Sequence, residues 1–462
     1  MNESIIISES VKAYFSAHTS LAALGTKMRT LKLFEPIVQE VKIAQKIVKY
    51  SPGEKLLDAF IAILAGAQGM VEINKCVRAD LGLQRAFGRT GCAEQSVVQD
   101  TLDACTAENV NQMHQAAEKI FRRHSQTYRH DYQLNWQILD VDMTGRPCGK
   151  KAKFASKGYF AKQRNRRGRQ EGYVIGSWYE EIVVERLFAG KTQLNRALQP
   201  LLEAAEQVLE LDDGKRPRTI VRIDSGAGSV GEINWLLGRD YQVHGKDYSG
   251  VRAKTLAESV RQWITDPADS NRQMGWVSLP AELYCRPVQR IAVRCRKKNG
   301  QWGYGVILST LAPREVLLLT GGYEQEVDDP KAVLLAYVNF YDQRGGSVEI
   351  EIKEDKQGLG TSKRNKKRFE AQQILIQLEA LAHNLLIWAR HWLSPHCPKL
   401  AQFGIKRLVR NVFQMDGFLF FDQAITLLQI QLNRADPFAK ELACGLASLL
   451  ALEQVALSLG ET

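Results

Sequence analysis

The order of strand-like and helix-like segments between residues 133 and 249 constrains the fold of this chain more than any other feature. Three strand-like segments come first, WQILDVDMT, GYVIGSWYE and IVVERLFAG, and the amphipathic segment LNRALQPLLEAAEQVLEL follows them. The strand RTIVRID, the helix VGEINWLLG and the strand YQVHGK complete the region. Three consecutive strands are typical of a meander, whereas the later strands alternate with helices as parallel crossovers do. The region therefore predicts a mixed α/β sheet.

This order is that of the ribonuclease H-like fold, although a glycine-rich turn suggests another interpretation. Gly226, Gly228 and Gly231 have the G-x-G-x-x-G spacing of a dinucleotide-binding turn. In a doubly wound fold that turn follows the first strand, but here it follows the fourth. Asp224 would also lie beside the pyrophosphate, and two anions in one site repel each other unless a cation lies between them. The turn therefore favours a metal-binding carboxylate over a dinucleotide.

The whole chain divides into five expected segments, which together predict an α/β core interrupted by an insertion. The insertion is rich in strand patterns, and EVLLLTG at residues 315–321 is expected to be one of its strands. The segments are a helical N-terminal domain with a candidate role in DNA binding (1–130), the first part of the ribonuclease H-like core (131–249), the β-rich insertion (250–328), the last helices of the core (329–393) and a helical C-terminal region (394–462).

The charge of the chain indicates an anionic partner. The chain has 62 Lys and Arg residues against 51 Asp and Glu residues, a formal net charge of +11. This balance favours nucleic acid first and a membrane surface second. The longest uncharged apolar run, residues 442–452, is too short to span a bilayer and predicts a core helix. The eight cysteines form no C-x-x-C pair, so we expect reduced thiols in a cytoplasmic protein.

Two basic stretches are candidates for DNA binding. Residues 146–169 contain ten Lys and Arg residues, no Asp or Glu, and the interleaved aromatic residues Phe154, Tyr159 and Phe160. Residues 362–368, SKRNKKR, form the second stretch. So many like charges would repel one another without an anion to bind, which favours a DNA-binding surface over a merely solvated one. The basic residues that we expect to contact DNA are Arg164, Arg166, Arg167, Arg169, Lys363 and Arg364.

Acidic residues stand at the ends of two strands that are expected to be neighbours. Asp140 and Asp142 are two residues apart, and therefore share one face of the first strand. Asp224 ends the fourth strand, which lies beside the first strand in a ribonuclease H-like sheet. Converging carboxylates are the usual protein ligands of the Mg²⁺ ions that assist phosphodiester chemistry. The sequence therefore predicts a magnesium site at this edge, with a third acid from a late helix.

The most specific motif is YDQRGGSVEIEIKEDK, which contains Tyr341, Arg344, Glu349 and Lys356. It resembles the Tyr-Arg-Glu-Lys signature of one branch of bacterial insertion-sequence DDE transposases, usually written Y-(2)-R-(3)-E-(6)-K. Here the interval between Arg and Glu is one residue longer. The resemblance covers nearly the whole chain, because LDVDMT and VRIDSG look like the two catalytic-Asp strands and the strand-rich block looks like the β-insertion of this group.

The resemblance implies a role for each matched residue. Asp142, Asp224 and Glu349 would be the catalytic, metal-binding triad. Asp142 is preferred to Asp140 because Asp-x-Thr is how the resembled strand closes. Arg344 and Lys356 would contact DNA phosphates near the cleaved end, and Tyr341 would help to position that strand. Trp302 resembles an insertion-domain tryptophan on which a flipped base stacks, but packing within its own hairpin is the favoured interpretation.

The extra residue before Glu349 changes the phase of the expected helix. On a regular helix Glu349 would lie about 140° from Arg344, whereas the usual spacing gives about 40°. Glycine is where a helix most easily kinks or takes a one-residue π-bulge, so we predict a bulge or break near residues 345–347. If the helix is regular instead, Glu351 is in phase with Arg344 and becomes the third acid.

Together these features predict an insertion-sequence DDE transposase with Mg²⁺ as its cofactor and Mn²⁺ as a substitute. It would bind double-stranded DNA, namely terminal inverted repeats and target DNA, as a homodimer in the bacterial cytoplasm, associated with the nucleoid. It would hydrolyse a phosphodiester at each element end and transfer the freed 3′-hydroxyl into target DNA. Two alternatives remain: a DNA-binding protein of transposase origin that does not cleave, and a Mg²⁺-dependent nuclease of the same fold.

Overall fold

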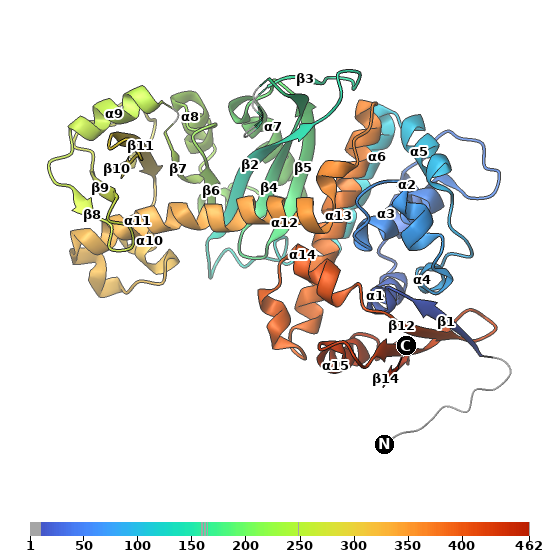
Figure 1. Ribbon diagram of the computed structural model, residues 1–462. Helices are drawn as coiled ribbons and strands as arrows, with labels where there is room; N and C mark the ends of the chain where they lie inside the picture. The colour runs from blue at the N-terminus through green and yellow to red at the C-terminus, as the bar shows by residue number, and fades with distance from the viewer. Residues whose placement is uncertain (1–10, 159, 161–162, 164, 248, 462) are drawn as a thin grey trace. The chain divides into compact units, whose positions relative to one another are not determined.

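The computed structural model describes residues 11–158, 160, 163, 165–247 and 249–461, which form two compact units (Figure 1). The central unit consists of Gln126–Pro147 and Ala155–Ile350. The terminal unit consists of Met1–Ser125, Cys148–Phe154 and Glu351–Thr462. Both units contain helices and strands, so the protein is of the mixed α/β class.

These units do not follow the five segments expected from the sequence. Segments 131–249 and 250–328 lie almost entirely in the central unit, so the β-rich insertion shares one compact unit with the core. The segment 329–393 is divided between the two units after Ile350. A boundary can fall inside one continuous helical run because the two ends of that run pack against different partners.

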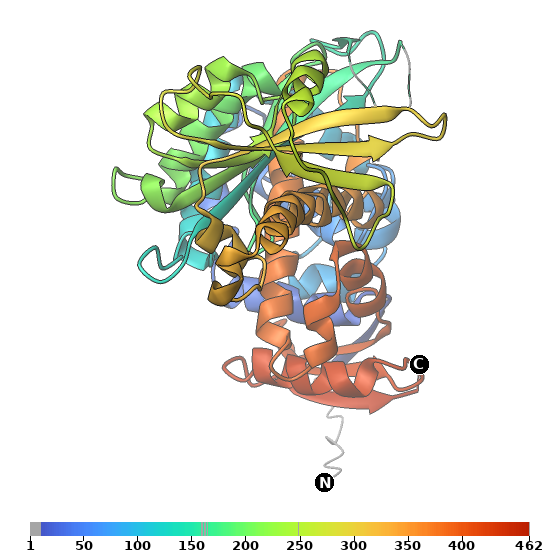
Figure 2. The same ribbon diagram turned by 90° about the vertical axis from the view of Figure 1, so that its left-hand side faces the viewer.

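A ten-stranded sheet forms the centre of the described part of the central unit (Figure 2). The order is β3-β4-β2-β6-β7-β11-β10-β9-β8, and β5 pairs with β4. The strands are β2 (Gln137–Pro147), β3 (Ser156–Lys157), β4 (Arg167–Gly176), β5 (Glu181–Ala189), β6 (Thr219–Ile223), β7 (Gln242–Lys246), β8 (Ile264–Thr265), β9 (Arg272–Trp276), β10 (Gln289–Arg296) and β11 (Trp302–Ser309).

The pairing confirms the strand arrangement predicted from the sequence. The first three long strands, β2, β4 and β5, form antiparallel pairs, whereas β2, β6 and β7 run parallel. The fourth predicted strand, β6, lies directly beside the first, β2. The strands of the insertion continue the same sheet, because β11 pairs with β7.

Helices cover both faces of this sheet. The central unit contains α7 (Leu194–Leu209), α8 (Val230–Gly238), α9 (Gly250–Glu258), α10 (Pro313–Leu319) and α11 (Pro330–Arg344). Side chains of α10 and α11 pack with Ile291 and Ile307, whereas the neighbouring Ala292 and Val306 point to the other face and pack with α9. Because residues alternate between the faces of a strand, α11 and α9 lie on opposite sides of the sheet.

The predicted strand at residues 315–321 is wrong, because this segment belongs to helix α10. Pro313 stands in the first turn, where its missing N–H removes no helical hydrogen bond. The Glu315 carboxylate accepts the backbone N–H of Ala312 at 2.7 Å and so caps the helix. A short apolar run such as VLLL fits a strand or a helix equally well, and here the proline and the cap decide.

The terminal unit is mainly helical. Its α-helices are α1 (Thr19–Thr30), α2 (Glu35–Glu40), α3 (Pro52–Leu64), α4 (Leu81–Ala86), α5 (Gln95–Ala104), α6 (Ala107–His124), most of α12 (Ile350–Gly358), α13 (Phe369–Leu393), α14 (Ile405–Arg407) and α15 (Ala439–Leu449). Ser51 caps α3, since its hydroxyl accepts the N–H of Glu54. Helix α13 is apolar nearly all round and therefore lies buried among α3, α5 and α6.

The prediction of a helical C-terminal region is wrong, because three strands lie in it, whereas the N-terminal domain is mainly helical as predicted and contains one strand among its described residues. A four-stranded sheet of order β1-β12-β13-β14 lies in the terminal unit. Its strands are β1 (Lys12–Ser16), β12 (Gly417–Phe421), β13 (Leu427–Asn433) and β14 (Ala456–Gly460). β1 pairs with β12, about four hundred residues further along the chain. Such a non-local pairing leaves no local pattern in the sequence.

No helix in the described ranges is long and apolar enough to cross a membrane. The apolar run at residues 442–452 largely forms α15, as predicted. All eight cysteines are free thiols.

Candidate active site

Asp142 and Asp224 stand side by side where the parallel pairing of β2 and β6 ends, Asp142 within β2 and Asp224 directly after β6. Val141 on β2 is in register with Ile223 on β6, so the residues that follow them, Asp142 and Asp224, are adjacent. The N–H of Met143 donates to Asp142 Oδ1 at 2.8 Å, and the N–H of Gly226 donates to Asp224 Oδ1 at 2.7 Å. A Cβ atom on residue 226 would lie 2.9 Å from that same oxygen, so glycine gives the carboxylate its room.

Asp140 differs from Asp142 because other side chains of the central unit already engage both of its carboxylate oxygens. Arg222 donates from Nε and Nη2 to the two oxygens of Asp140 at 2.6 and 2.7 Å, and Ser177 donates its hydroxyl at 2.6 Å. Asp140 is fully buried, whereas the side chain of Asp142 is 15% exposed. Because both oxygens of Asp140 are already engaged, the structure favours Asp142 as the available carboxylate.

Arg222 is a site residue that the sequence reasoning missed. Its Nη1 also donates to the carbonyl of Phe340 at 3.0 Å, which joins β2, β6 and α11 through one guanidinium. The signal was present in VRID, where Arg222 is two residues before Asp224 and therefore on the same face of the strand. A buried arginine on that face requires a buried acid opposite it.

The predicted irregularity in the late helix is present. Helix α11 ends at Arg344, and a π-helical turn, η4 (Gly345–Glu349), continues directly into α12. The wider turn accommodates the extra residue. It places Arg344 between two acids, with Nη2 at 3.4 Å from Asp142 Oδ1 and Nη1 at 3.9 Å from Glu349 Oε1.

The two possible third acids have different environments. Glu349 is 65% exposed and shares Arg344 with Asp142. Glu351 is 7% exposed and falls in the terminal unit, as does Lys356. Glu349 is therefore the acid that the central unit brings to Asp142.

Arg344 is buried, and this differs from the exposed phosphate contact expected of it. Its exposed fraction is 3%, and Nη2 donates to the carbonyl of Val141 at 2.9 Å. Burial alone would lower the pKa of Arg344, but the carboxylates of Asp142, Asp140 and Asp224 outweigh this effect and raise it. The guanidinium is thus a permanent positive charge among the acids.

Burial raises the pKa of Asp142 to about 6, and the carboxylates of Asp224 and Glu349 act in the same direction against Arg344. Between about pH 4 and pH 6 the folded protein keeps a proton that the unfolded chain has lost, so this group makes stability fall as pH rises. One pKa unit corresponds to about 1.4 kcal/mol. We therefore expect Asp142→Asn to be more stable than the wild type at pH 7 by about 1–3 kcal/mol, and similar near pH 4.

Urea unfolding in EDTA at both pH values measures this difference. The exposed Asp240→Asn serves as the matched control and should show no gain in stability at either pH. If Asp142→Asn is no more stable than the wild type at pH 7, the prediction that the buried carboxylate of Asp142 destabilises the folded protein is wrong.

The donor atoms at this site have the chemistry that a divalent cation requires. Among the described residues, no group of three or more His, Cys, Asp or Glu side chains is already arranged to hold a metal ion. The oxygens of Asp142, Asp224 and Glu349 are nonetheless hard ligands of the kind Mg²⁺ and Mn²⁺ take. Arg344 places a positive charge between two of these acids.

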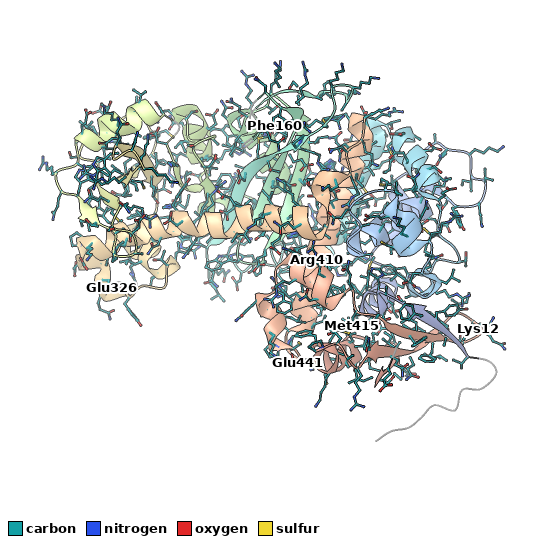
Figure 3. The ribbon with its side chains drawn as sticks, in the orientation of Figure 1. Lys12, Phe160, Glu326, Arg410, Met415 and Glu441 are labelled. Carbon is teal, nitrogen blue, oxygen red and sulfur yellow. The ribbon has the colours of Figure 1, made fainter. Side chains whose placement is uncertain are left out.

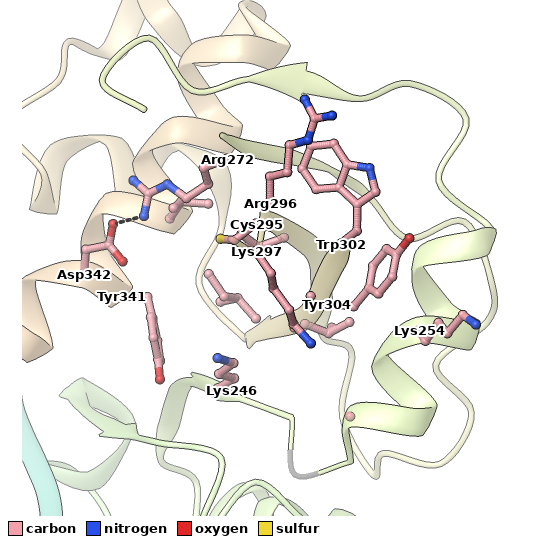
Figure 4. Close-up of a pocket in the computed structure, with 17 residues that line it drawn as sticks. Lys246, Lys254, Arg272, Cys295, Arg296, Lys297, Trp302, Tyr304, Tyr341 and Asp342 are labelled. Carbon is pink, nitrogen blue, oxygen red and sulfur yellow. Dashed lines mark hydrogen bonds and ion pairs between the residues drawn. The ribbon is translucent and has the colours of Figure 1, made fainter. Parts of the chain in front are cut away.

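A cavity of about 600 Å³ lies beside Tyr341 in the central unit (Figure 4). Tyr341 is on one side of it, and Trp302 and Tyr304 are on the other. Five basic side chains line it: Lys246, Lys254, Arg272, Arg296 and Lys297. Burial raises the pKa of Tyr341 to about 12, so its hydroxyl stays protonated. The cavity combines positive charge with aromatic surface, which suits nucleic acid.

The basic residues predicted to contact DNA are placed differently from one another. Arg166, Arg167 and Lys363 are exposed, whereas Arg164 lies outside the described residues. The prediction that Arg169 and Arg364 contact DNA at the surface is wrong, because their side chains are buried, with exposed fractions of 1% and 3%. A guanidinium taken out of water needs internal acceptors, and Arg364 has the carboxylate of Glu379 and the carbonyls of Ala67 and Leu359.

The aromatic residues of the first basic stretch also differ. Phe160 is 6% exposed and packs against the glycines of β2 and β4, where a Cβ atom on Gly145 or Gly168 would meet its ring (Figure 3). Phe154 is 54% exposed, and Tyr159 lies outside the described residues. Phe160 is therefore a core residue of the sheet and not part of a DNA-tracking surface.

Comparison with known proteins defines the class of this protein. A family model described as "Transposase DDE domain group 1" matches residues 14–454, so the chain belongs to this family of DDE transposases. The protein is therefore a transposase, and divalent metal ions are the general cofactors of its family. A search of curated proteins found no match. A solved structure titled "Cryo-EM structure of piggyBac transposase synaptic complex with hairpin DNA (SNHP)" aligns with 12% identity and a TM-score of 0.45, over 87% of this chain and 82% of that one.

Proposed function

We propose that this transposase belongs to a bacterial insertion sequence, cleaves the DNA at the ends of its element and transfers the freed 3′-hydroxyl into target DNA. The observation that carries the proposal is the register of β2 and β6, which puts Asp142 beside Asp224, while Arg344 links Glu349 to Asp142. The strand order of the sheet supports a ribonuclease H-like core.

The proposed ligands of Mg²⁺, or of Mn²⁺ in its place, are Asp142, Asp224 and Glu349. When bound, the metal would polarise the scissile phosphate and activate the attacking oxygen. The chain itself fixes two of the ligands: the N–H groups of Met143 and Gly226 orient the two aspartates. The pair of Asp140 and Arg222 holds β2, β6 and α11 together, so that strand ends and helix meet in one place.

The proposed DNA contacts come from three places. In the central unit, Arg166 and Arg167 are exposed, and the basic cavity beside Tyr341 would accept part of a DNA strand. In the terminal unit, the two basic stretches meet: the N–H of Lys153 donates to the carbonyl of Lys367 at 2.9 Å, and Phe154 contacts Phe369. Lys363 is exposed beside them, and Lys356 completes the proposed phosphate contacts.

Trp302 is more restricted than the resemblance suggests. The guanidinium of Arg294 lies 4.6 Å from the centre of its ring and 4.1 Å from that of Trp263. One face of Trp302 is therefore covered from within the chain. A base could stack only on the remaining face. The contact of the covered face with Arg294, which belongs to the same hairpin, agrees with the expectation that Trp302 packs within its hairpin.

The partners proposed for the protein are its terminal inverted repeats, target DNA and a second copy of the chain. The proposed location is the bacterial cytoplasm, in association with the nucleoid. A purified protein incubated with Mg²⁺ and DNA that carries the repeats flanking its reading frame tests the function. Cleaved ends together with joined products are expected. Binding without cleavage would support the DNA-binding alternative, and cleavage without joining would support the nuclease.

The exposed arginines allow a quantitative test of DNA binding. Each phosphate that a protein neutralises contributes a slope of about −0.9 to the plot of log affinity against log salt. Replacing Arg166 and Arg167 by Gln should therefore make the slope shallower by about one to two units. The matched control is the exposed pair Arg261 and Arg314, replaced in the same way. Equal slopes in the Arg166/Arg167 variant and the wild type would show that these two arginines are solvated and do not contact DNA phosphates.

A further inference from the structure

Arg344 occupies a position that a cation would take between two of the three acids. Its two terminal nitrogens face Asp142 and Glu349 at 3.4 and 3.9 Å, and a guanidinium stays charged at any working pH. Two like charges a few ångströms apart repel strongly in a partly buried site. A positive Arg344 in this place therefore opposes a second cation on the same carboxylates.

The contacts of Arg344 are looser than those of its neighbour Arg222. Arg222 holds both oxygens of Asp140 at 2.6 and 2.7 Å. Arg344 approaches one oxygen of each acid at a longer distance, and its buried Nε has no hydrogen-bond partner. A buried donor without a partner is unfavourable. Arg222 is thus held at both oxygens of its acid, whereas Arg344 has one close hydrogen bond, from Nη2 to the carbonyl of Val141 at 2.9 Å, and approaches its two acids less closely.

The balance of charge at the site indicates when Arg344 would have to move. Three carboxylates and one guanidinium give a net charge of −2, which one divalent ion neutralises. A second divalent ion would leave the site positive unless Arg344 moves or an anion enters. A DNA phosphate is such an anion, and it is also a natural partner for a guanidinium.

We propose that Arg344 is an exchangeable internal cation, which holds Asp142 and Glu349 in the absence of metal and gives way when metal binds. This inference rests on the proposed function, because it takes the metal site as given. It assigns Arg344 a role in controlling metal affinity in addition to the phosphate contact expected from the sequence. By linkage, a DNA end that draws Arg344 away tightens metal binding by the same factor as metal tightens DNA binding.

Mn²⁺ binding to the full-length protein without DNA, followed by the electron paramagnetic resonance of free Mn²⁺, tests the proposal. Arg344→Gln should bind Mn²⁺ at least about tenfold more tightly than the wild type, because a competing charge is gone. Arg344→Lys, which keeps the charge, should remain near the wild type. Arg314→Gln is the matched control and should not change the affinity, because Arg314 is paired with Glu324 and not with the three acids. Equal or weaker binding by Arg344→Gln overturns the proposal, as does equal tightening by Arg314→Gln.

A measurement on the wild type removes any dependence on how the variants fold. Phenylglyoxal modifies accessible arginines, and mass spectrometry reads the modified sites. Saturating Mn²⁺ should raise the labelling of Arg344 several-fold and leave Arg222 unchanged. Labelling of Arg344 that stays the same or decreases overturns the proposal.

The same titrations separate this inference from the proposed function. If Asp224→Asn loses Mn²⁺ binding while Arg344→Gln gains nothing, only the role of Arg344 fails. If Asp224→Asn binds Mn²⁺ as the wild type does, or the wild type binds none, the metal site itself fails.

Discussion

Asp224→Asn is expected to reduce cleavage at the element ends by about 10³-fold or more and to leave DNA affinity within about threefold of the wild type. A metal held by carboxylates contributes several kcal/mol to phosphoryl transfer, and about 1.4 kcal/mol corresponds to a factor of ten in rate. Asparagine keeps the shape of the side chain and can still accept the N–H of Gly226. The loss would therefore report on charge and metal binding rather than on folding.

Two measurements accompany this prediction. Cleavage of labelled end DNA and binding of the same DNA in EDTA are compared for Asp224→Asn and for Asp240→Asn, an exposed aspartate of the same unit that serves as the control. Cleavage by Asp224→Asn at the wild-type rate would remove Asp224 from the catalytic site. A loss of binding as large as the loss of cleavage would instead indicate a damaged fold.

The sheet of the central unit could be predicted from the sequence because its signals are local. The strands β2, β4, β5 and β6 each contain a short cluster of apolar, mostly β-branched residues, and α7 and α8 separate β5 from β6 and β6 from β7. The adjacency of Asp142 and Asp224 then follows from the fold, without any knowledge of side chains. The glycine turn after Asp224 was ambiguous as a motif, and the position of the turn in the strand order was what distinguished the two interpretations.

The sheet of the terminal unit was missed for two different reasons. β13 has a readable signal, since Ile430 and Leu432 are buried and alternate with Gln429 and Gln431. This period of two was overlooked in a region that was otherwise helical. β1 has no such signal, because its five residues are held by β12 from the far end of the chain. Only the tertiary structure reveals that pairing.

Charge counting along the sequence also had a limit. Arg146, Arg169, Arg364 and Lys366 belong to basic stretches that suggested a surface, yet all four are buried. Arg146 pairs with Glu171 and Arg364 pairs with Glu379, acids that lie elsewhere in the chain. A run of cations shows how much charge is present but not which side chains face solvent. The exposed members, Arg166 and Arg167 among them, are those that the salt experiment tests.

Replacing the proposed third acid, Glu349, is also expected to reduce cleavage strongly. Glu349→Gln should reduce cleavage by about 10²-fold or more, because it removes a proposed metal ligand that faces Arg344. Glu351→Gln should retain cleavage within about tenfold, and urea unfolding would report any effect of changing this buried residue. The reverse pattern, with Glu351→Gln inactive and Glu349→Gln active, would make Glu351 the ligand.

The π-helical turn gives this prediction a sharper form. Deleting Gly346 removes the extra residue and restores the usual interval between Arg344 and Glu349, which a regular helix places about 40° apart. The helix beyond the turn keeps its phase, so we expect Mn²⁺ binding and cleavage to survive within about tenfold. Inserting one alanine between Gly346 and Ser347 turns Glu349 by about a further 100° and should abolish both. If the deletion and the insertion are equally inactive, cleavage requires the π-helical turn itself and not only the orientation of Glu349. If both are active, the orientation of Glu349 is irrelevant, and a side chain that need not face Asp142 and Asp224 cannot be their partner in holding a metal.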